Sequence, residues 1–349
     1  MIVKSFEYDD YLWKLNTIYL DKLNLIVGKN AVGKSKTLKA MIDVARFIKG
    51  DTAGVSAHSC RIVFSDEMGK ELIYSYEGSI KEILSESMIY GDKQLILRNA
   101  ESSLVNGENV NPPQNKLVIQ SQRDTTKFPE FEIVMSWAEH SRGFSFSELS
   151  SSQSYMIPNM FSEKIDFSEL FEKIDDEKEQ FVINNMRALG YNINEISKLD
   201  VQQFKMITLS EDGVFVPLFS SYMSNGMLRV FYVLTYMAYV ATVEGAKTFL
   251  VDDLGEGLDY SRSSMLSKIM FDYCETHDIQ LIVTSNDNFL MNAIDLDNWI
   301  ILQRKGKNVS AYSQFTHPDM FIKFRKMGLN NFDMLSTGFI ERFLSSQEQ

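Results

Sequence analysis

A glycine-rich stretch near the start of the chain carries the clearest chemistry. It reads Gly28-Lys29-Asn30-Ala31-Val32-Gly33-Lys34-Ser35 and fits the pattern G-x-x-x-x-G-K-[ST] at every fixed position. Such glycines let successive backbone N–H groups turn inward, and the helix that follows directs its positive end toward phosphate oxygens. The pattern predicts that Lys34 bridges the β- and γ-phosphates of a nucleotide and that the Ser35 hydroxyl takes one position around Mg²⁺. We expect these residues, together with Lys36, to bind a nucleotide.

Two adjacent acids late in the chain are candidates for a second metal position. Asp252 and Asp253 follow the apolar run 248–251, which has the character of a buried strand. Ligands of open α/β sheets bind at the carboxyl ends of the strands, where these acids would lie. A phosphate-binding loop needs a carboxylate on a neighbouring strand to hold its metal. We therefore expect Asp252 to be a ligand of Mg²⁺ and Asp253 to polarise the attacking water.

A third candidate is Ser224-Asn225-Gly226, which directly precedes a long predicted helix. Ser, Asn and Gly at a helix start leave backbone N–H groups ready to bind an anion. Many such sequences only cap a helix. The order of the motifs is more informative, because the phosphate-binding loop is followed by a long insert, then by this helix start, then by the two acids.

The predicted elements that position these motifs alternate between strands and helices. The strands expected before residue 128 are IVKSF, YLWKLNTIYL, LNLIV, RIVF, ELIYSY, KQLIL and KLVIQ. Helices are expected over residues 37–48 and 167–189, from the end of Ser224-Asn225-Gly226 to about residue 243, from about residue 261, and in the segment 317–343. The later strands expected are VFVPLF, TFLVDD, QLIVTS, WIILQ and VSAY, and the serine-rich stretch 145–154 predicts a loop.

Composition places the chain among ordinary globular proteins. Of its 349 residues 44% are apolar and 23% are charged, and the formal net charge is −12, which disfavours unaided binding of a phosphate backbone. Cys60 and Cys274 are far apart in sequence, so a disulfide framework or zinc cluster is excluded. Acidic residues among the first ten exclude a signal peptide, and the longest apolar run, 230–243, is shorter than the roughly 20 residues that span a bilayer. We expect a cytoplasmic protein with no membrane partner.

The motifs together resemble those of the ABC-type ATPase heads shared by SMC, RecF and OLD-like proteins. GKNAVGKS is similar to their G-x-N-x-x-G-K-S loop, and YMSNGMLRVFYVL is similar to the signature helix of their small predicted ATP-binding members. VDDLGEGLD stands where these families carry the Walker B strand and the D-loop, which makes Asp259 the D-loop acid, and Asn286 stands at the switch histidine. The resemblance implies that Asp259 and Asn286 contact the nucleotide. The resemblance implies an α/β fold of the P-loop NTPase type. Its ATPase head would have a mixed sheet with N-terminal antiparallel strands, formed by residues 1–127 and 213–349, and a compact inserted helical lobe at 128–212.

The resemblance also implies cofactors and a partner copy. ATP and Mg²⁺ would be bound, and two heads would form a homodimer over the nucleotide. Ser224 and Gly226 of one copy would close on the γ-phosphate that the other copy holds. The family's Q-loop glutamine would reach the metal, and Gln120 at the end of KLVIQ is the first choice for it, with Gln122 next.

Two departures from the family pattern point to slow turnover. Asp253 replaces the usual Glu and is one methylene shorter, which withdraws its carboxylate. Asn286 replaces the usual switch histidine and can hydrogen-bond a phosphate or water but cannot shuttle a proton.

Three functions are consistent with these motifs. The first is an ATPase whose nucleotide state controls a separate effector, a nuclease or toxin, as in bacterial anti-phage defence or toxin–antitoxin modules; this function is carried over from the family by analogy. The second is a RecF-like ATPase of DNA repair whose dimer clamps a duplex, which the net charge of −12 disfavours. The third is a scaffold that binds ATP without hydrolysing it.

Overall fold

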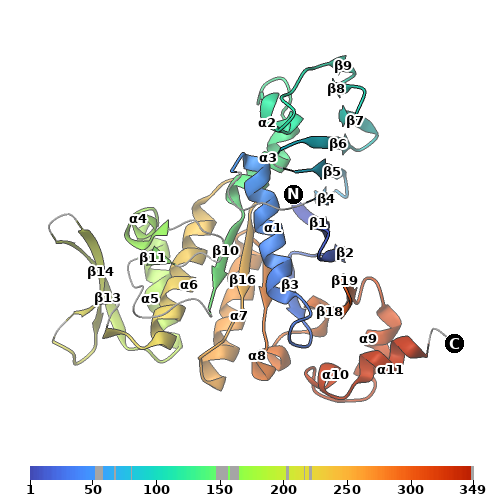
Figure 1. The fold of residues 1–349 in the computed structure, drawn as a ribbon. Helices are drawn as coiled ribbons and strands as arrows, with labels where there is room; N and C mark the ends of the chain where they lie inside the picture. The colour runs from blue at the N-terminus through green and yellow to red at the C-terminus, as the bar shows by residue number, and fades with distance from the viewer. Residues whose placement is uncertain are drawn as a thin grey trace. The chain divides into compact units, whose positions relative to one another are not determined.

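The expected alternation of strands and helices is present in the structure, which is a computed structural model (Figure 1). The structure describes residues 1–51, 58–66, 68–79, 81–146, 156–157, 165–201, 204–215, 217–219 and 222–346. The chain divides into two compact units, which are described one at a time. Unit 1 comprises Met1–Ser141, Gly245–Thr248 and Asp295–Gln349, and unit 2 comprises Arg142–Glu244 and Phe249–Ile294.

Unit 1 is built on a mixed sheet. In spatial order its strands are β3 (Leu23–Val27), β18 (Trp299–Lys305), β19 (Asn308–Ser313), β2 (Lys14–Tyr19), β1 (Ile2–Asp9), β4 (Ser59–Ser65), β5 (Glu71–Gly78), β6 (Ile83–Tyr90), β7 (Lys93–Arg98), β8 (Ser103–Val105) and β9 (Glu108–Asn109). β3 pairs in parallel with β18, and β19 pairs in parallel with β2. β1 is antiparallel to both β2 and β4, and antiparallel pairing continues from β4 to β9. The predicted mixed sheet with N-terminal antiparallel strands is confirmed.

The helices of unit 1 include the one that the phosphate-binding loop requires. They are α1 (Lys34–Lys49), α2 (Val118–Ser121), α3 (Phe131–His140), the short η3 (Leu296–Asn298), α9 (Pro318–Arg325), α10 (Asp333–Ser336) and α11 (Phe339–Ser345). α1 begins where the loop after β3 ends, and α2 and α3 pack against α1 near its far end (Figure 1). The apolar residues of α1 recur at helical spacing and are buried, including Leu38, Met41, Val44, Ala45 and Ile48. Burial of this face holds α1, and with it the end of the loop, in place.

Unit 2 carries the second group of motifs. Its strands β10 (Arg142–Ser145), β16 (Thr248–Asp252) and β17 (Gln280–Thr284) are neighbours in that order, and its helices are α4 (Phe167–Glu172), α5 (Asp176–Ala188), α6 (Asn225–Thr242), α7 (Tyr260–Thr276) and α8 (Asn288–Ala293). Two smaller sheets contain β11 (Met156–Ile157) with β12 (Ile165–Asp166), and β13 (Ile193–Val201) with β14 (Phe204–Glu211) and β15 (Leu218–Phe219). Every residue of β16 and β17 is buried, as expected for apolar strands covered on both faces.

One buried carboxylate explains two differences from the sequence prediction in unit 1. The segment KLVIQ is predicted as a strand, but its last residues begin α2, whose N–H groups at Val118 and Ile119 donate to Glu86 at 2.5 and 3.0 Å. Glu86 lies on β6, a strand that the sequence analysis missed because a carboxylate stands at a buried position, where strand patterns have an apolar residue. Capping by Glu86 thus replaces a predicted strand with a short helix.

The segment 128–212 contains both helices and strands. The helical pattern over residues 167–189 is divided into α4 and α5, and Asp175 begins α5 by accepting a hydrogen bond from the backbone N of Lys178 at 2.9 Å. The antiparallel pair β13–β14 follows, which the prediction of a compact helical lobe did not include. Of the predicted serine-rich loop at 145–154, only the first two residues lie within the described part of the chain. Among the helices that the structure describes, none is long and apolar enough to cross a membrane.

Candidate nucleotide-binding site

The phosphate-binding loop lies between β3 and α1, as predicted, and two glycines shape it. Gly28 has φ +154°, and a Cβ at this position would lie 2.7 Å from the carbonyl oxygen of Leu302 on β18. Gly33 has φ +112°, and a Cβ there would lie 3.0 Å from Nε1 of the buried Trp13. A residue with a side chain suits neither the backbone conformation nor the space. The glycines therefore let the loop pack directly against β18 and the indole of Trp13.

Lys34 directs its ammonium group into the loop. The residue is 7% exposed, and Nζ donates to the carbonyl oxygens of Gly28 at 2.8 Å and Lys29 at 3.4 Å. Phosphate oxygens form stronger, charge-assisted bonds with an ammonium group than neutral carbonyls do. The neighbouring Ser35 is exposed, so its hydroxyl is accessible to a metal ion. These features fit the predicted binding of a phosphate group and of Mg²⁺, which prefers oxygen ligands.

The first turn of α1 is suited to an anion. Gly33 stands at its N-cap and provides no side-chain acceptor, so no cap of this kind competes for the N–H groups that open the helix. α1 has 16 residues, enough to place a positive dipole end at the loop. The helix therefore supports the role predicted for the loop.

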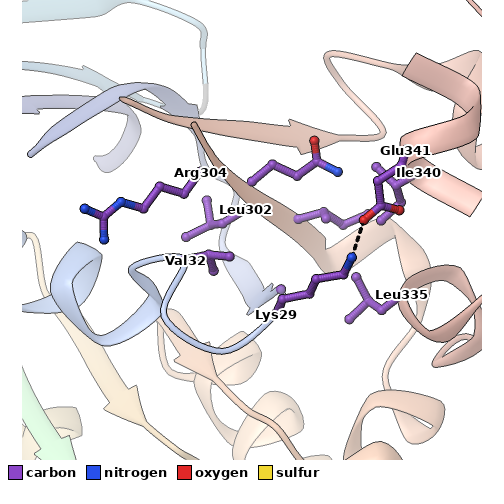
Figure 2. Close-up of a pocket in the computed structure, with 10 residues that line it drawn as sticks. Lys29, Val32, Leu302, Arg304, Leu335, Ile340 and Glu341 are labelled. Atoms are coloured by element: carbon purple, nitrogen blue, oxygen red, sulfur yellow. Dashed lines mark hydrogen bonds and ion pairs between the residues drawn. The ribbon is translucent and has the colours of Figure 1, made fainter. Parts of the chain in front are cut away.

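Carboxylates pair with Lys29 and Lys36, which lie on either side of Lys34 in the sequence. Nζ of Lys36 lies 2.9 Å from Oδ2 of Asp10, and it lies over the Trp13 ring at 4.9 Å from the centroid. Nζ of Lys29 lies 2.5 Å from Oε1 of Glu341 on α11. Figure 2 shows the second pair at the edge of a cavity of about 260 Å³ beside the loop. The sequence analysis missed both carboxylates, because nothing in the local sequence links them to the loop.

Thr284 connects the two predicted acids of unit 2. Asp252 is buried at the end of β16 and accepts a hydrogen bond from Oγ1 of Thr284 at 2.5 Å. The backbone N of Asp253 donates to the same hydroxyl oxygen at 2.9 Å. One hydroxyl at the end of β17 therefore fixes the position of both acids. Thr284 lies in the predicted strand QLIVTS, and the sequence alone assigned it no role.

Asp253 occupies an unusual backbone conformation. Its φ is +52°, in the left-handed region that residues other than glycine rarely adopt. Nδ2 of Asn286 donates to Oδ1 of Asp253 at 3.2 Å, and the backbone N of Leu254 donates to the Thr284 carbonyl at 2.8 Å. Strained backbone of this kind is frequent at functional sites. The conformation and the bond from Asn286 together orient the Asp253 carboxylate.

Helix α6 starts at the predicted Ser224-Asn225-Gly226 segment. Ser224 is its N-cap, and Oγ of Ser224 accepts a hydrogen bond from the backbone N of Met227 at 3.2 Å. Ser224 and Asn225 are exposed. A Cβ at Gly226 would lie 3.2 Å from the Leu258 side chain, so the glycine allows α6 to contact the turn that precedes α7. The start of α6 and this turn are therefore packed together within unit 2.

Asp259 has a structural role in this conformation. It caps α7 by accepting from the backbone N of Arg262 at 3.1 Å, and its other oxygen pairs with Nη1 of Arg262 at 2.9 Å. The hydrogen bond from that backbone N–H is the main cause of the lowered pKa of Asp259. Its predicted contact with a nucleotide would require the carboxylate to exchange these partners.

The structure does not support Gln120 as a metal ligand. Nε2 of Gln120 donates to the carbonyl oxygens of Phe47 at 2.6 Å and Ile48 at 3.1 Å, at the C-terminal end of α1. Ser35 lies at the other end of α1, about 18 Å away at 1.5 Å per residue. Gln120 belongs to the short helix α2, which forms because Glu86 caps it, so the side chain satisfies helix carbonyls instead of reaching the loop.

The structure brings the predicted residues together in two groups. Unit 1 holds the loop of residues 28–36, and unit 2 holds the acids, Asn286 and the start of α6. That both groups act on one nucleotide stays a prediction.

Comparisons with known proteins bear on the fold. No protein-family model matches the chain. A Helicobacter pylori protein described as an ATP/GTP phosphatase is 23% identical over 326 residues, which covers 78% of this chain and 82% of the relative. Among solved structures, an SMC head bound to the C-winged helix domain of ScpA matches with a TM-score of 0.54 and 12% identity over 89% of this chain and 97% of that chain. The fold is that of an SMC head domain.

A second SMC head supports this assignment. It carries an extended coiled coil, is bound to the C-terminal domain of ScpA derived from Pyrococcus furiosus, and matches with a TM-score of 0.50 and 12% identity over 93% of this chain and 99% of that chain. The SMC head has the ABC-type ATPase fold, so the predicted fold class is confirmed. At 12% identity the match establishes the fold and leaves the activity to be argued from the residues.

Proposed function

We propose that this SMC-head fold binds Mg·ATP and hydrolyses it slowly. The observation that carries the proposal is the Lys34 ammonium, which lies inside a glycine-shaped loop at the start of α1 and donates to two loop carbonyls, at 2.8 and 3.4 Å. The similarity to an ATP/GTP phosphatase of Helicobacter pylori supports a nucleotide as the ligand. Lys34 would hold the β- and γ-phosphates, and the first N–H groups of α1 would donate to them.

The roles proposed for the other residues follow from their chemistry. Ser35 and Asp252 would be the protein ligands of Mg²⁺, which when bound neutralises charge on the phosphates. Thr284 would keep the Asp252 carboxylate oriented through their 2.5 Å hydrogen bond. Asp253 would accept a proton from the attacking water, with Asn286 holding one of its oxygens. Asn286 cannot relay that proton further, which is why we propose slow turnover.

Phosphate release from ATP by the purified chain tests this proposal. Replacement Asp253→Asn should lower the rate by about a hundredfold, because it removes the proton acceptor and keeps the shape of the side chain. ATP affinity should stay within about twofold of wild type, since the predicted phosphate contacts come from the loop. A variant that releases phosphate at the wild-type rate would show that Asp253 is not the acceptor.

We further propose a homodimer that closes over ATP and controls a separate effector. Ser224 and Asn225 are exposed at the start of α6, where a second copy's γ-phosphate could be bound. Two solved SMC heads of this fold are bound to domains of ScpA, which supports a protein partner in general terms. The role in bacterial anti-phage defence or in a toxin–antitoxin module rests on family analogy.

The mass of the Asp253→Asn variant in solution, with and without Mg·ATP, tests the dimer. The mass should double with ATP in this variant, and it should stay that of one chain when Ser224→Arg is added, because the bulky side chain blocks the helix start. A single-chain mass under all conditions would exclude ATP-dependent dimerisation.

A further inference from the structure

The C-terminal helix α11 reaches the phosphate-binding loop through one ion pair. Nζ of Lys29 lies 2.5 Å from Oε1 of Glu341, and Figure 2 shows the Lys29 side chain extended toward α11. The hydrogen bond from Lys29 is the main cause of the lowered pKa of the Glu341 carboxyl, which is therefore ionised near neutral pH. A full negative charge thus lies beside a loop whose shape suits an anion.

The carboxylate is anchored more firmly than the lysine. α11 is held by the buried side chains of Phe339, Ile340 and Phe343, and the Phe339 ring packs edge-on against Phe324 of α9 at 5.2 Å between centroids. Lys29, in contrast, lies on the loop with a flexible stem, and its side chain is 69% exposed. Packing of α11 therefore fixes the backbone from which the Glu341 carboxylate extends, while the Lys29 ammonium group can turn to another partner.

The pair is weak enough to exchange. The two side chains are 69% and 45% exposed, and exposed ion pairs contribute little to stability because water and salt screen them. A triphosphate carries several negative charges and would compete effectively for the ammonium group. The carbonyl of Lys29 already accepts from the Lys34 ammonium at 3.4 Å, so Lys29 is part of the wall around the proposed phosphate position.

We infer that Glu341 is a competing carboxylate that draws Lys29 away from the nucleotide phosphates and so lowers nucleotide affinity. This inference rests on the proposed function of the loop. On binding, Lys29 exchanges the Glu341 carboxylate for a phosphate oxygen, and no covalent bond changes. The C-terminal helices α9–α11 thereby lower the affinity of the loop for nucleotide.

The dissociation constant for Mg·ADP in Glu341→Gln tests this inference. The variant should bind about three- to tenfold more tightly than wild type at low salt, because Lys29 no longer pairs with a carboxylate and is released to the phosphates. The gain should shrink to less than about twofold at high ionic strength, which a purely structural role of Glu341 would not produce. Asp319→Asn, which removes an exposed charge from α9 in the same segment, is the matched control and should leave the constant unchanged.

A second substitution separates exchange of Lys29 from simple repulsion by Glu341. In a Lys29→Gln background, Glu341→Gln should change the dissociation constant by less than about twofold. An unchanged or weaker affinity of the single Glu341→Gln variant, or a full gain in the Lys29→Gln background, would overturn the inference while leaving the proposed function intact. Absence of Mg·ADP binding by the wild-type chain would instead remove the proposed function and this inference with it.

Discussion

The side-chain amide of Asn286 donates a hydrogen bond to Oδ1 of Asp253, with 3.2 Å between nitrogen and oxygen. These are the two residues at which the sequence departs from the motif pattern of the ATPase heads that it resembles. The backbone N of Asp253 is in turn bonded to Thr284, which donates to Asp252. The residue at the predicted switch position and the predicted water-polarising acid are therefore direct partners. An amide there can orient the acid without taking up its proton.

Replacement Asn286→Ala should lower the rate of ATP hydrolysis by about tenfold with nearly unchanged ATP affinity. The reason is that Asn286 bonds to the proposed proton acceptor, so its loss disorders the carboxylate during the reaction. Steady-state phosphate release and equilibrium ATP binding measure the two effects separately. Asn288→Ala, an exposed asparagine at the start of α8, is the matched control. Equal rates in both variants would rule out an orienting role for Asn286.

Replacement Gly28→Ala should destabilise unit 1 by roughly 1–3 kcal/mol and abolish nucleotide binding. The added Cβ would lie 2.7 Å from the Leu302 carbonyl oxygen, so either β18 or the loop must shift. Gly50→Ala is the control, because Gly50 has φ +97° and a Cβ there would meet nothing within 4 Å. Urea unfolding and ATP titration of both variants give the comparison. We expect Gly50→Ala to lower the free energy of unfolding by about 1 kcal/mol and to leave nucleotide binding intact. Retained nucleotide binding in Gly28→Ala would show that the close contact with Leu302 does not shape the loop.

The stability of unit 1 should fall as the pH rises from about 4.5 to 7. Burial raises the pKa of Glu86 from 4.5 to about 7, against the opposing effects of Tyr74, Arg98 and the α2 N–H groups. The folded protein binds the Glu86 proton more tightly than the unfolded chain does. The free energy of unfolding is therefore highest below pH 4.5, the ordinary pKa of Glu86, and it falls by roughly 3 kcal/mol in total as the pH rises to about 7, the pKa of Glu86 in the folded protein. The measurement is the free energy of unfolding in urea at several pH values for wild type and Glu86→Gln.

The comparison with Glu86→Gln isolates this residue from other titrating groups. Glutamine does not titrate, so the stability of wild type relative to the variant should decrease steadily over this pH range. If the stability of wild type relative to Glu86→Gln stays constant with pH, or increases toward pH 7, the pKa of Glu86 is not raised.

The sequence predicted those parts of the fold in which local pattern and tertiary role agree. The loop, α1, α6 and the buried strand before Asp252 were all expected, because glycines, helical spacing and apolar runs signal them directly. The strand β6 and the helix α2 were not, since the buried Glu86 carboxyl accepts hydrogen bonds from Tyr74, 12 positions earlier, and from backbone N–H groups more than 30 positions later in the chain. No pattern in the sequence around Glu86 indicates these hydrogen-bond partners.

The same distinction applies to the candidate site. Lys34 and the two acids follow from recognisable motifs, and the structure places them at the ends of the expected elements. Gln120 was assigned from its place at the end of a predicted strand, and the structure does not support the assignment because that segment forms the helix α2. The bond of Lys29 to Glu341 joins residues at opposite ends of the chain, so only the folded structure reveals it.

Calorimetric titration of ATP, with and without Mg²⁺, tests whether Lys34 and Asp252 bind the same Mg·ATP molecule. Lys34→Ala should weaken ATP binding by about a hundredfold or more under both conditions, because the loop loses its ammonium group. Asp252→Asn should bind ATP as wild type does without Mg²⁺ and should lose most of the gain in affinity that Mg²⁺ gives to wild type. Wild-type affinity in Lys34→Ala, or an undiminished effect of Mg²⁺ in Asp252→Asn, would show that these two residues do not bind one Mg·ATP molecule.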